Sequence, residues 1–223
     1  MSSQPVSPPA AVSDPAFWHD LYARGSDRWE LGGPAPPLVE YLAGATAPGH
    51  APRRRLPGER VAVPGCGRGH DGRLWRRLGY RVFCFDFVAE VAQEARRLAE
   101  RDGVALTVEA RDVFTLDRDY AGFFDGVWEY TCFCAIDPAR RPEYVRLLRK
   151  ILKPGGWLLA CFFPLRAGSS GGPPFATTEG EVRELLAPGF TLVEAYTPAA
   201  SAPGRQGLEW VVLARLDEGA REA

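Results

Sequence analysis

The chain is 223 residues long, a length that predicts one ordinary domain with at most a short extension. Apolar residues make up 46% and charged residues 25%, values that exclude a wholly disordered chain and a coiled coil. The formal charge of -1 gives no electrostatic reason to expect a nucleic-acid partner, since such proteins usually carry a basic face. No apolar run approaches the ~18–20 residues of a membrane span, so we expect no membrane partner.

The two ends of the chain and its cysteines suggest little chemistry. Residues 1–14 lack the basic and apolar regions of a secretory signal, and their prolines and serines predict a flexible arm. Residues 217–223 are expected to form a short C-terminal tail. The five cysteines are odd in number and irregular in spacing, which indicates reduced thiols in a cytoplasmic protein and neither a disulfide framework nor a metal site.

The first predicted helix begins after Asp14, which can cap it, with Pro15 in the first turn. A second short helix is expected over 37–42, followed by a linker rich in Pro, Gly and Arg over 46–60. The first helix carries its large apolar residues on one face by i, i+3, i+4 spacing: Phe17, Trp18, Leu21 and Tyr22.

From residue 60 onward, strand-like and helix-like segments alternate. Alternation of this kind predicts an α/β, Rossmann-like domain over 15–216, with a mostly parallel seven-stranded sheet and helices on both faces. No helix separates the last two strands, so we expect them to form an antiparallel hairpin at one edge. The strands are expected over 60–64, 80–85, 105–108, 124–131, 157–163, 190–196 and 208–216. Helices are expected from the glycine-rich turn to 78 and over 88–101, 137–152 and 179–186, with a turn at 153–156.

A glycine-rich turn joins the first predicted strand to the helix after it. Gly65, Gly67 and Gly69 form a G-x-G-x-G pattern, which lets the chain turn tightly and lets a ligand approach the backbone. Asp86 follows Gly65 by 21 residues, at the end of the second predicted strand. An acid at that place accepts hydrogen bonds from ribose hydroxyls, so the pair predicts a nucleoside-containing cofactor.

The residues after the glycines indicate which cofactor this is. A dinucleotide site needs a third glycine where this chain has His70, and its pyrophosphate uses the helix N-terminus. Asp71 would repel a phosphate there, whereas S-adenosylmethionine has no phosphate and carries a cationic sulfonium. His70 itself is expected to cap the helix start. At the end of the third strand, Asp112 can accept from the adenine amine and Val113 can pack against the ring.

Taken together, these motifs resemble class I S-adenosylmethionine-dependent methyltransferases, and within them the thiopurine S-methyltransferase family, especially its thiol/halide methyltransferase branch. The resemblance extends from Phe17 to about Leu216, and the string from Pro64 to Asp71 and the G-P-P-F at 172–175 are its specific parts. The remaining matches are Trp18, Tyr22, Trp29, Asp86 and the segments 111–114, 133–136, 140–142 and 152–156.

The resemblance implies roles for particular residues. Trp18, Tyr22 and Trp29 would form a lid over the cofactor, within an N-terminal lid region over 15–45. Tyr22 departs from the thiol/halide branch, which more often has tryptophan there. Tyr130 stands where thiopurine enzymes have arginine and where the thiol/halide branch has an aromatic residue, which argues against a close thiopurine-enzyme orthologue. Further implied contacts are Gly65 with the cofactor backbone, Asp86 with the ribose, Asp112 and Val113 with the adenine, Tyr130 with the cofactor, and Pro174 and Phe175 with the acceptor.

The implied reaction is an in-line methyl transfer from S-adenosylmethionine to a small soft nucleophile, either a thiol or a halide or chalcogen compound, leaving S-adenosylhomocysteine. Alignment and desolvation would carry most of the catalysis, and the sequence nominates no general base. Three alternatives stay open: an oxygen or nitrogen acceptor, a nicotinamide-dependent oxidoreductase, and a non-catalytic nucleoside-binding module. The expected partner is a small-molecule acceptor with no nucleic acid, no metal is expected, and a monomer is slightly favoured.

Overall fold

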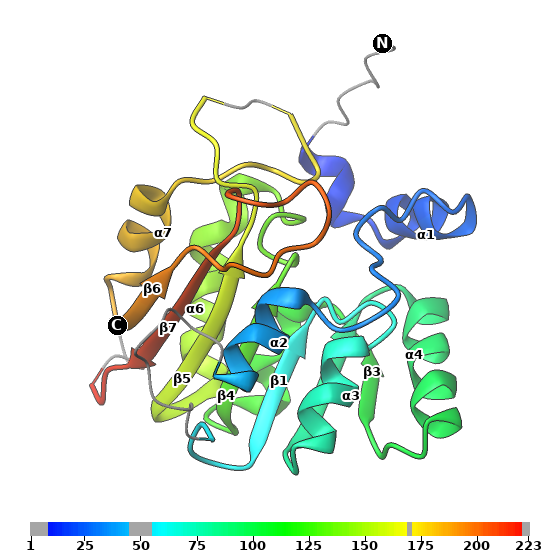
Figure 1. Ribbon diagram of the computed structural model, residues 1–223, viewed down its shortest axis with the longest axis horizontal. Helices are drawn as coiled ribbons and strands as arrows, with labels where there is room; N and C mark the ends of the chain where they lie inside the picture. Colours follow the sequence, from blue (N-terminus) through cyan, green and yellow to red (C-terminus); the bar gives the residue numbers. More distant parts are fainter. Residues whose placement is uncertain (1–8, 45–54, 169–170, 220–223) are drawn as a thin grey trace.

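The computed structural model describes residues 9–44, 55–168 and 171–219. Most of the linker expected over 46–60, and the outermost parts of both expected tails, therefore lie outside the described residues. The described part folds around a single sheet whose strands follow the order β3-β2-β1-β4-β5-β7-β6 (Figure 1). The strands are β1 (Arg60–Pro64), β2 (Arg81–Asp86), β3 (Thr107–Ala110), β4 (Phe124–Tyr130), β5 (Leu152–Phe162), β6 (Phe190–Tyr196) and β7 (Trp210–Leu216).

The pairing of these strands confirms the predicted fold class. Strands β1 to β5 pair in parallel, while β7 runs antiparallel to both β5 and β6. The antiparallel pair closes one edge of the sheet, as the short connection between the last two strands required. Because β7 runs antiparallel to β5, its first residue, Trp210, pairs with Phe162 and sits at the same end of the sheet as the last residues of the parallel strands.

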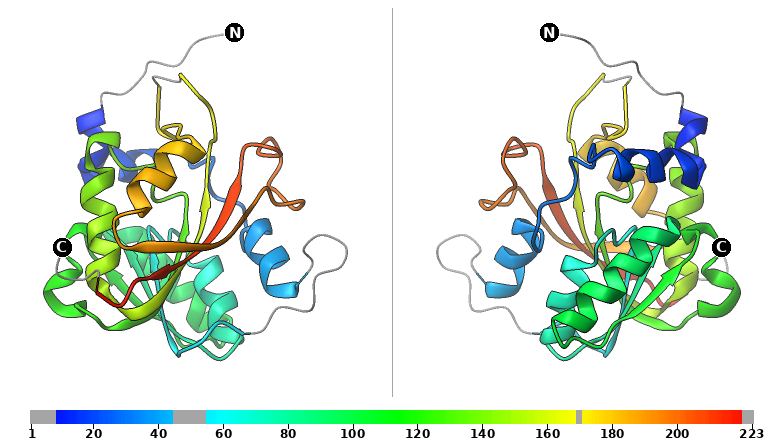
Figure 2. Two further views of the ribbon diagram at one scale, coloured as in Figure 1. Left: turned by 90° about the vertical axis from the view of Figure 1, so that its left-hand side faces the viewer. Right: turned by 90° about the vertical axis from the view of Figure 1, so that its right-hand side faces the viewer.

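Helices cover both faces of the sheet, and Figure 2 shows α2 and α6 on opposite sides of it. One buried core joins one face to α2, α3 and α4, and another joins the opposite face to α6 and α7. The α-helices are α1 (Pro15–Ala23), α2 (Pro36–Ala43), α3 (His70–Arg77), α4 (Ala89–Arg101), α5 (Asp117–Tyr120), α6 (Arg141–Ile151) and α7 (Glu179–Leu186). Short 3-10 turns occupy Pro9–Ser13, Val113–Thr115 and Pro138–Arg140.

The alternation of side chains along β1 shows how the two cores form. Val61 and Val63 pack into the core with α2, α3 and α4, whereas Ala62 between them belongs to the opposite core. Trp75 of α3 and Trp157 of β5 are completely buried on the first side, with ring centroids 5.5 Å apart. Full burial of a large apolar side chain stabilises the fold by roughly 1.5–3 kcal/mol, so these layers hold the strand ends in place.

Several element boundaries differ from the sequence expectations. The helix expected over 137–152 is a 3-10 turn followed by α6, because Asp137 caps the turn through Ala139 N. The turn expected at 153–156 lies inside β5 as an irregularity: Phe124 pairs with Leu152, and Gly126 already pairs with Trp157. The described part of the expected N-terminal arm forms the 3-10 turn Pro9–Ser13, in which Val12 is buried.

Three separate stretches of chain gather at the carboxyl ends of the parallel strands. Figure 1 shows α1 and the segment after it, the connection from β5 to α7, and the connection from β6 to β7 at this end of the sheet. In α/β sheets of this kind, ligands bind at this end. The longest helix, α4, has 13 residues, and within the described ranges no helix combines the length and apolar character that a membrane crossing requires.

Candidate active site

The glycine-rich turn follows β1 directly and brings bare backbone to the carboxyl end of the sheet. Gly65, Gly67 and Gly69 have φ values of +57°, +51° and +72°, a region that residues with a side chain rarely adopt. A Cβ placed on Gly65 would lie 2.9 Å from the Cβ of Cys132, at the end of β4. The turn therefore needs glycine both for its conformation and for its close approach to β4.

Asp86, at the end of β2, holds this turn from below. Its Oδ2 accepts from Gly67 N at 3.0 Å, and its Oδ1 accepts from Val88 N at 3.0 Å. Burial raises the pKa of Asp86 to about 6, although the two backbone hydrogen bonds oppose that change. Each carboxylate oxygen can accept a further hydrogen bond, so the side chain can hold the turn and still accept from a ligand.

An aromatic cluster lies above the turn and is built from the lid residues that the sequence predicts. Trp29 packs edge-on against Trp18 and Tyr22, with ring centroids 5.3 and 5.2 Å apart, and its Nε1 donates to Tyr22 Oη at 2.9 Å. A Cβ on Gly67 would lie 3.4 Å from that hydroxyl. Burial, and secondly the charge of Asp86, raise the pKa of the Tyr22 hydroxyl far above its usual value.

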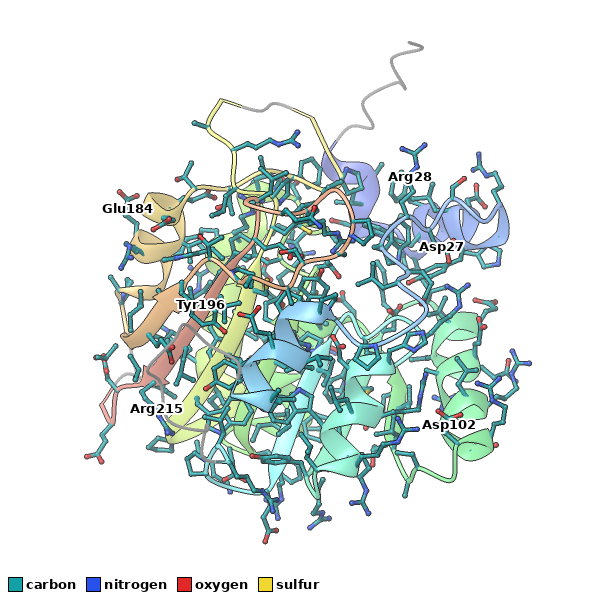
Figure 3. The ribbon with its side chains drawn as sticks, in the orientation of Figure 1. Asp27, Arg28, Asp102, Glu184, Tyr196 and Arg215 are labelled. Carbon is teal, nitrogen blue, oxygen red and sulfur yellow. The ribbon has the colours of Figure 1, made fainter. Side chains whose placement is uncertain are left out.

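Charged residues fasten the lid to the turn. Arg68 lies between the carboxylates of Asp27, Glu30 and Glu94, at N–O distances of 2.5, 3.1 and 3.2 Å. Figure 3 shows Asp27 on the segment between α1 and α2, which also carries Trp29. Burial alone would raise the pKa of Glu30, but hydrogen bonds from His70, Gly32 and Arg68 lower it to about 2. The lid segment therefore meets the turn through the ionised carboxylate of Glu30.

His70 takes part in this fastening, and the expectation that it caps the helix is wrong. Gly69, with its left-handed backbone, occupies the cap position of α3, so His70 is the first residue of the helix. Its imidazole lies 2.8 Å from Glu30 Oε1 through Nε2 and 2.8 Å from Arg73 Nη2 through Nδ1. A side chain that points back toward the lid cannot satisfy the free amides of its own helix.

Asp71 links the lid to β4. Its Oδ1 accepts from Ala35 N and its Oδ2 from Trp128 Nε1, both at 2.7 Å. Burial raises the pKa of Asp71 despite these hydrogen bonds. The acid that the sequence places at the helix start is thus a partly buried, hydrogen-bonded group beside the turn. Its hydrogen bond with Ala35 N also fixes the N-terminus of α2.

The end of β4 forms the wall opposite the glycine turn. Thr131 has φ +65°, the one positive value among the described non-glycine residues. Glu129 Oε1 accepts from Phe133 N at 2.8 Å, and its Oε2 accepts from Tyr144 Oη, so the buried carboxylate braces the chain on both sides of Thr131. Burial raises the pKa of Glu129 to about 7 against these hydrogen bonds. Strained backbone of this kind concentrates at functional sites.

The other predicted site residues lie around the same end of the sheet. Asp112 is exposed and accepts from Phe114 N at 3.0 Å, and Val113 beside it is buried in the core. Phe175 is buried in one cluster with Trp18, and its backbone N donates to Cys134 O at 2.7 Å. Pro174 precedes it in the connection between β5 and α7. The adenine and acceptor roles of these residues stay predictions.

A narrow cleft separates the turn from β4. Its free volume is about 60 Å³, far below the roughly 300–1,000 Å³ of small-molecule sites. The cleft in this structure is therefore too small for a nucleoside. Of the predicted residues, Trp29, Gly65 and Tyr130 line the cleft directly. Residues that sequence reasoning did not place there also line it: Glu30, Leu31, Ala35, Trp128 and Thr131. Arg68, His70 and Asp71, which follow the first glycines of the predicted turn, line it as well.

The electrostatics of the cleft suit a cationic ligand. The guanidinium of Arg68 is already matched by three carboxylates, and Asp71 and Asp86 lie beside the turn. Within the described ranges, no group of three or more His, Cys, Asp or Glu side chains is placed to hold a metal ion. The donor set thus fits a ligand with ribose hydroxyls and a positive centre, as S-adenosylmethionine has.

Comparisons with known proteins agree with this geometry. A family model described as thiopurine S-methyltransferase matches residues 13–218. The chain is 28% identical to probable thiol methyltransferase 2 of Arabidopsis thaliana over 195 residues, covering 86% of this chain and 81% of that protein. It is 31% identical to thiocyanate methyltransferase 1 of Brassica oleracea over 198 residues, with the same coverage. A thiopurine S-methyltransferase of Legionella pneumophila is 24% identical over 180 residues, or 74% of this chain and 77% of that protein.

Solved structures agree on the architecture. A Burkholderia thailandensis 1,6-didemethyltoxoflavin-N1-methyltransferase, solved with its substrate and S-adenosylhomocysteine, superposes with a TM-score of 0.72 at 25% identity, covering 97% of this chain and 93% of that one. With the family model spanning nearly the whole chain, and with the glycine turn, Asp86 and the aromatic lid brought together at one end of the sheet, the chain belongs to the thiopurine S-methyltransferase family of S-adenosylmethionine-dependent methyltransferases.

Proposed function

We propose that this protein transfers the methyl group of S-adenosylmethionine to a small sulfur nucleophile, such as a thiol or the thiocyanate ion. The observation that carries the proposal is the contact between Asp86 and the glycine turn, directly beneath an aromatic lid. The cofactor, when bound, supplies a methyl group on a cationic sulfur. The sulfur class of the acceptor follows from the names of the thiol and thiocyanate methyltransferases that the chain resembles.

On the donor side, the chain binds the nucleoside through groups that are already in place. Asp86 accepts from the ribose hydroxyls with the acceptor positions that Gly67 and Val88 leave free. Gly65 lets the cofactor lie against bare backbone. Asp112 and Val113, next along the sheet edge, receive the adenine. Because β1, β2 and β3 are adjacent, these contacts follow one another along the carboxyl edge of the sheet.

The lid completes the site by excluding water. Trp18, Tyr22 and Trp29 present aromatic faces to the sulfonium, and a desolvated cation–π contact is worth of order 1–2 kcal/mol. The ion pairs of Arg68 with Asp27 and Glu30 hold the lid closed. Alignment of the acceptor with the methyl carbon, in a space without water, lowers the activation free energy by about 7–11 kcal/mol in favourable cases.

On the acceptor side, we place Tyr130 and Thr131 against the reacting sulfur, with Phe175 and Pro174 lining the way in. Tyr130 lines the cleft at the end of β4, opposite the glycine turn. Phe175 packs in the cluster that contains Trp18, so the connection between β5 and α7 is in contact with the lid. The partner is accordingly a small molecule, and we expect a monomer that acts in the cytoplasm and needs no nucleic acid or metal.

Calorimetry and product analysis test this proposal. Titration with S-adenosylmethionine and S-adenosylhomocysteine is expected to give saturable binding by the folded protein. Incubation with a labelled methyl donor and a panel of thiols, thiocyanate, iodide, phenols and amines is expected to label the sulfur compounds. Absence of cofactor binding rejects the proposal outright. Binding without transfer to any acceptor identifies a nucleoside-binding module, and transfer to phenols or amines alone reassigns the acceptor class.

A further inference from the structure

Behind Tyr130, toward β7, lie two ionisable side chains that the proposed transfer does not use. The connection between β6 and β7 carries Arg205, and Glu209 directly precedes the first residue of β7. Arg205 Nη1 donates to Tyr130 Oη at 2.5 Å, and Tyr130 Oη donates to Glu209 Oε1 at 2.7 Å. The three side chains form one directed hydrogen-bond chain that ends on a carboxylate.

This chain is removed from solvent. Glu209 exposes 0% of its surface, and Arg205 and Tyr130 expose 8% each. Arg205 lies 3.9 Å from Glu209 and 4.6 Å from the centroid of the Phe163 ring. Among the residues that the structure describes, none donates a hydrogen bond to Glu209 Oε2. Keeping a buried carboxylate with one unpaired oxygen is costly, which indicates a task beyond fixing the connection.

Tyr130 is the member of this chain that also lines the cleft. A hydroxyl has one proton and two acceptor positions. The proton points to Glu209 and Arg205 fills one acceptor position, so the described residues leave one acceptor position of the hydroxyl unfilled. Burial raises the pKa of the Tyr130 hydroxyl far above its usual value, so the residue keeps its proton unless another replaces it.

We propose that Tyr130 and Glu209 form a proton relay for acceptors that carry a proton, with Arg205 as the positioning residue; the proposal rests on the methyl transfer proposed above. As the sulfur of a neutral thiol attacks the methyl carbon, its S–H bond breaks and the proton moves to Tyr130 Oη. The proton of Tyr130 moves to Glu209 Oε1. The thiol electron pair forms the new S–C bond, and the pair of the broken C–S bond stays on the donor sulfur.

The surroundings of the relay allow this proton to stay until the product leaves. Arg205 faces both Tyr130 and Glu209; the charge of the Cys161 thiol of β5 couples to Arg205 and Glu209, and that of the Cys134 thiol, whose pKa burial also raises, couples to Arg205. Burial raises the pKa of Cys161 well above its ordinary value, so it stays an uncharged thiol. After product release, Glu209 returns the proton through Tyr130 to the opened cleft.

The relay matters only for protic acceptors. A thiol must lose a proton during transfer, whereas thiocyanate and iodide are anions with none to lose. Loss of the relay therefore slows transfer to thiols and spares transfer to the two anions. A residue that merely holds the connection to β4 in place affects all acceptors alike. The contrast between acceptors separates the two roles within one set of variants.

Two variants test the relay, with a matched control. Glu209→Gln removes the proton acceptor, and Tyr130→Phe removes the hydroxyl while keeping the ring. Glu184→Gln makes the same carboxylate change on the exposed surface of α7, where Figure 3 labels the residue. We expect both relay variants to lower kcat with an alkyl thiol by about 100-fold and kcat with thiocyanate or iodide by less than about threefold. The control should match the wild type with every acceptor.

A pH profile and a binding measurement complete the experiment. At saturating cofactor, the variants' kcat with an alkyl thiol should rise about tenfold per pH unit from about pH 7 toward the thiol pKa of ~8.5, because only pre-formed thiolate reacts. The wild-type profile should be nearly flat there. In calorimetry with the S-adenosylhomocysteine complex, Tyr130→Phe should weaken thiol binding by about fivefold and leave thiocyanate binding unchanged, because only the thiol donates to the hydroxyl.

The possible outcomes are distinguishable. Equal losses for thiols and anions, or flat pH profiles in the variants, overturn the relay while the methyl transfer stands. A wild-type protein that methylates no sulfur compound overturns the proposed function itself. If Glu209→Gln does not fold, as circular dichroism would show, Tyr130→Phe decides the question alone, because it keeps the buried carboxylate and its arginine.

Discussion

The proposed donor and acceptor sides of the site differ in what forms them. The donor side is backbone: a glycine turn held by one carboxylate that lies 19 residues along the chain from the amide it binds. The acceptor side is made of side chains from distant segments, with Tyr130 bonded to Arg205 and Glu209 across 75 and 79 residues. The first arrangement fixes one ligand, and the second leaves the neighbouring pocket adjustable by substitution.

The largest expected effect comes from adding one methyl group to the donor side. Gly65→Ala places a Cβ 2.9 Å from the Cβ of Cys132 at a φ of +57°, so the turn must shift. We expect affinity for S-adenosylmethionine to fall by at least about 100-fold, since tight positive-φ positions tolerate only glycine. Calorimetry measures this loss.

Gly25→Ala is the matched control for this change. Its φ is +63°, and no atom lies within 4 Å of the added Cβ. It should bind the cofactor like the wild type. If Gly65→Ala binds within a few-fold of the wild type, the donor side is more adjustable than its backbone construction implies, and the comparison between the two sides fails.

Asp86→Asn probes the charge of the carboxylate beneath the turn. An amide cannot accept from both Gly67 N and Val88 N, so we expect about 30-fold weaker cofactor binding. Since the pKa of Asp86 is about 6, wild-type affinity should weaken as pH falls through that value and the carboxylate is protonated. Affinity of the variant should change little there. A wild-type affinity that is constant from pH 5 to 8 contradicts the assigned role.

Glu129→Gln tests the brace behind the acceptor side. The pKa of Glu129 is about 7 in the folded protein against 4.5 as its ordinary value, so the folded state holds a proton that the unfolded chain releases. The resulting stabilisation is complete below about pH 4.5 and is lost as pH rises through 7. Between pH 5 and 8 the wild type should lose about 2 kcal/mol more free energy of unfolding than the variant.

Urea unfolding at both pH values measures this difference. Glu184→Gln, an exposed change of the same kind, should keep the wild-type dependence on pH. Parallel pH dependences for the wild type and Glu129→Gln would show that the buried carboxylate is already ionised at pH 5, and would remove Glu129 from the account of the acceptor wall.

The smallest expected effect concerns the lid, which both sides share. Arg68→Ala removes the ion pairs with Asp27 and Glu30. We expect S-adenosylhomocysteine to dissociate about fivefold faster, the modest effect of a partly exposed network of charges. Stopped-flow tryptophan fluorescence can follow the release through Trp29. Arg28→Ala is the control, since Arg28 is exposed on the same segment (Figure 3). An unchanged release rate in Arg68→Ala means that the aromatic cluster alone closes the lid.

The sequence predicts the donor side well because its signals are local. Three glycines between a strand and a helix, and an acid at the end of the next strand, are readable from spacing alone, and the structure places Gly65 and Asp86 at one turn. All seven strands were also predictable, since each is a short apolar run bounded by turn residues. The end of β3 and the start of β5 were less so: β3 continues to Ala110 through regular pairing with β2, and irregular pairing with β4 decides where β5 starts.

The contacts on the proposed acceptor side could not be predicted from the sequence, for a physical reason. Arg205 and Glu209 stand in a connection rich in Gly and Pro, where charged residues are usually solvated, and only the placement of β7 brings them to Tyr130. The prediction that His70 caps α3 is wrong for a similar reason, because its partner Glu30 lies on a separate segment. Contacts that depend on the packing of distant segments leave no periodic trace in a sequence.

The reversed direction of β7 has a practical consequence for engineering. The last strand, β7, begins at the carboxyl ends of the parallel strands, where the candidate active site lies. Residues 197–209 therefore form an exchangeable segment whose two ends are held by β6 and β7. Exchanging this segment between related proteins should change the acceptor preference between anions and protic thiols. The affinity for the cofactor should stay the same, because its proposed contacts lie after β1 and β2.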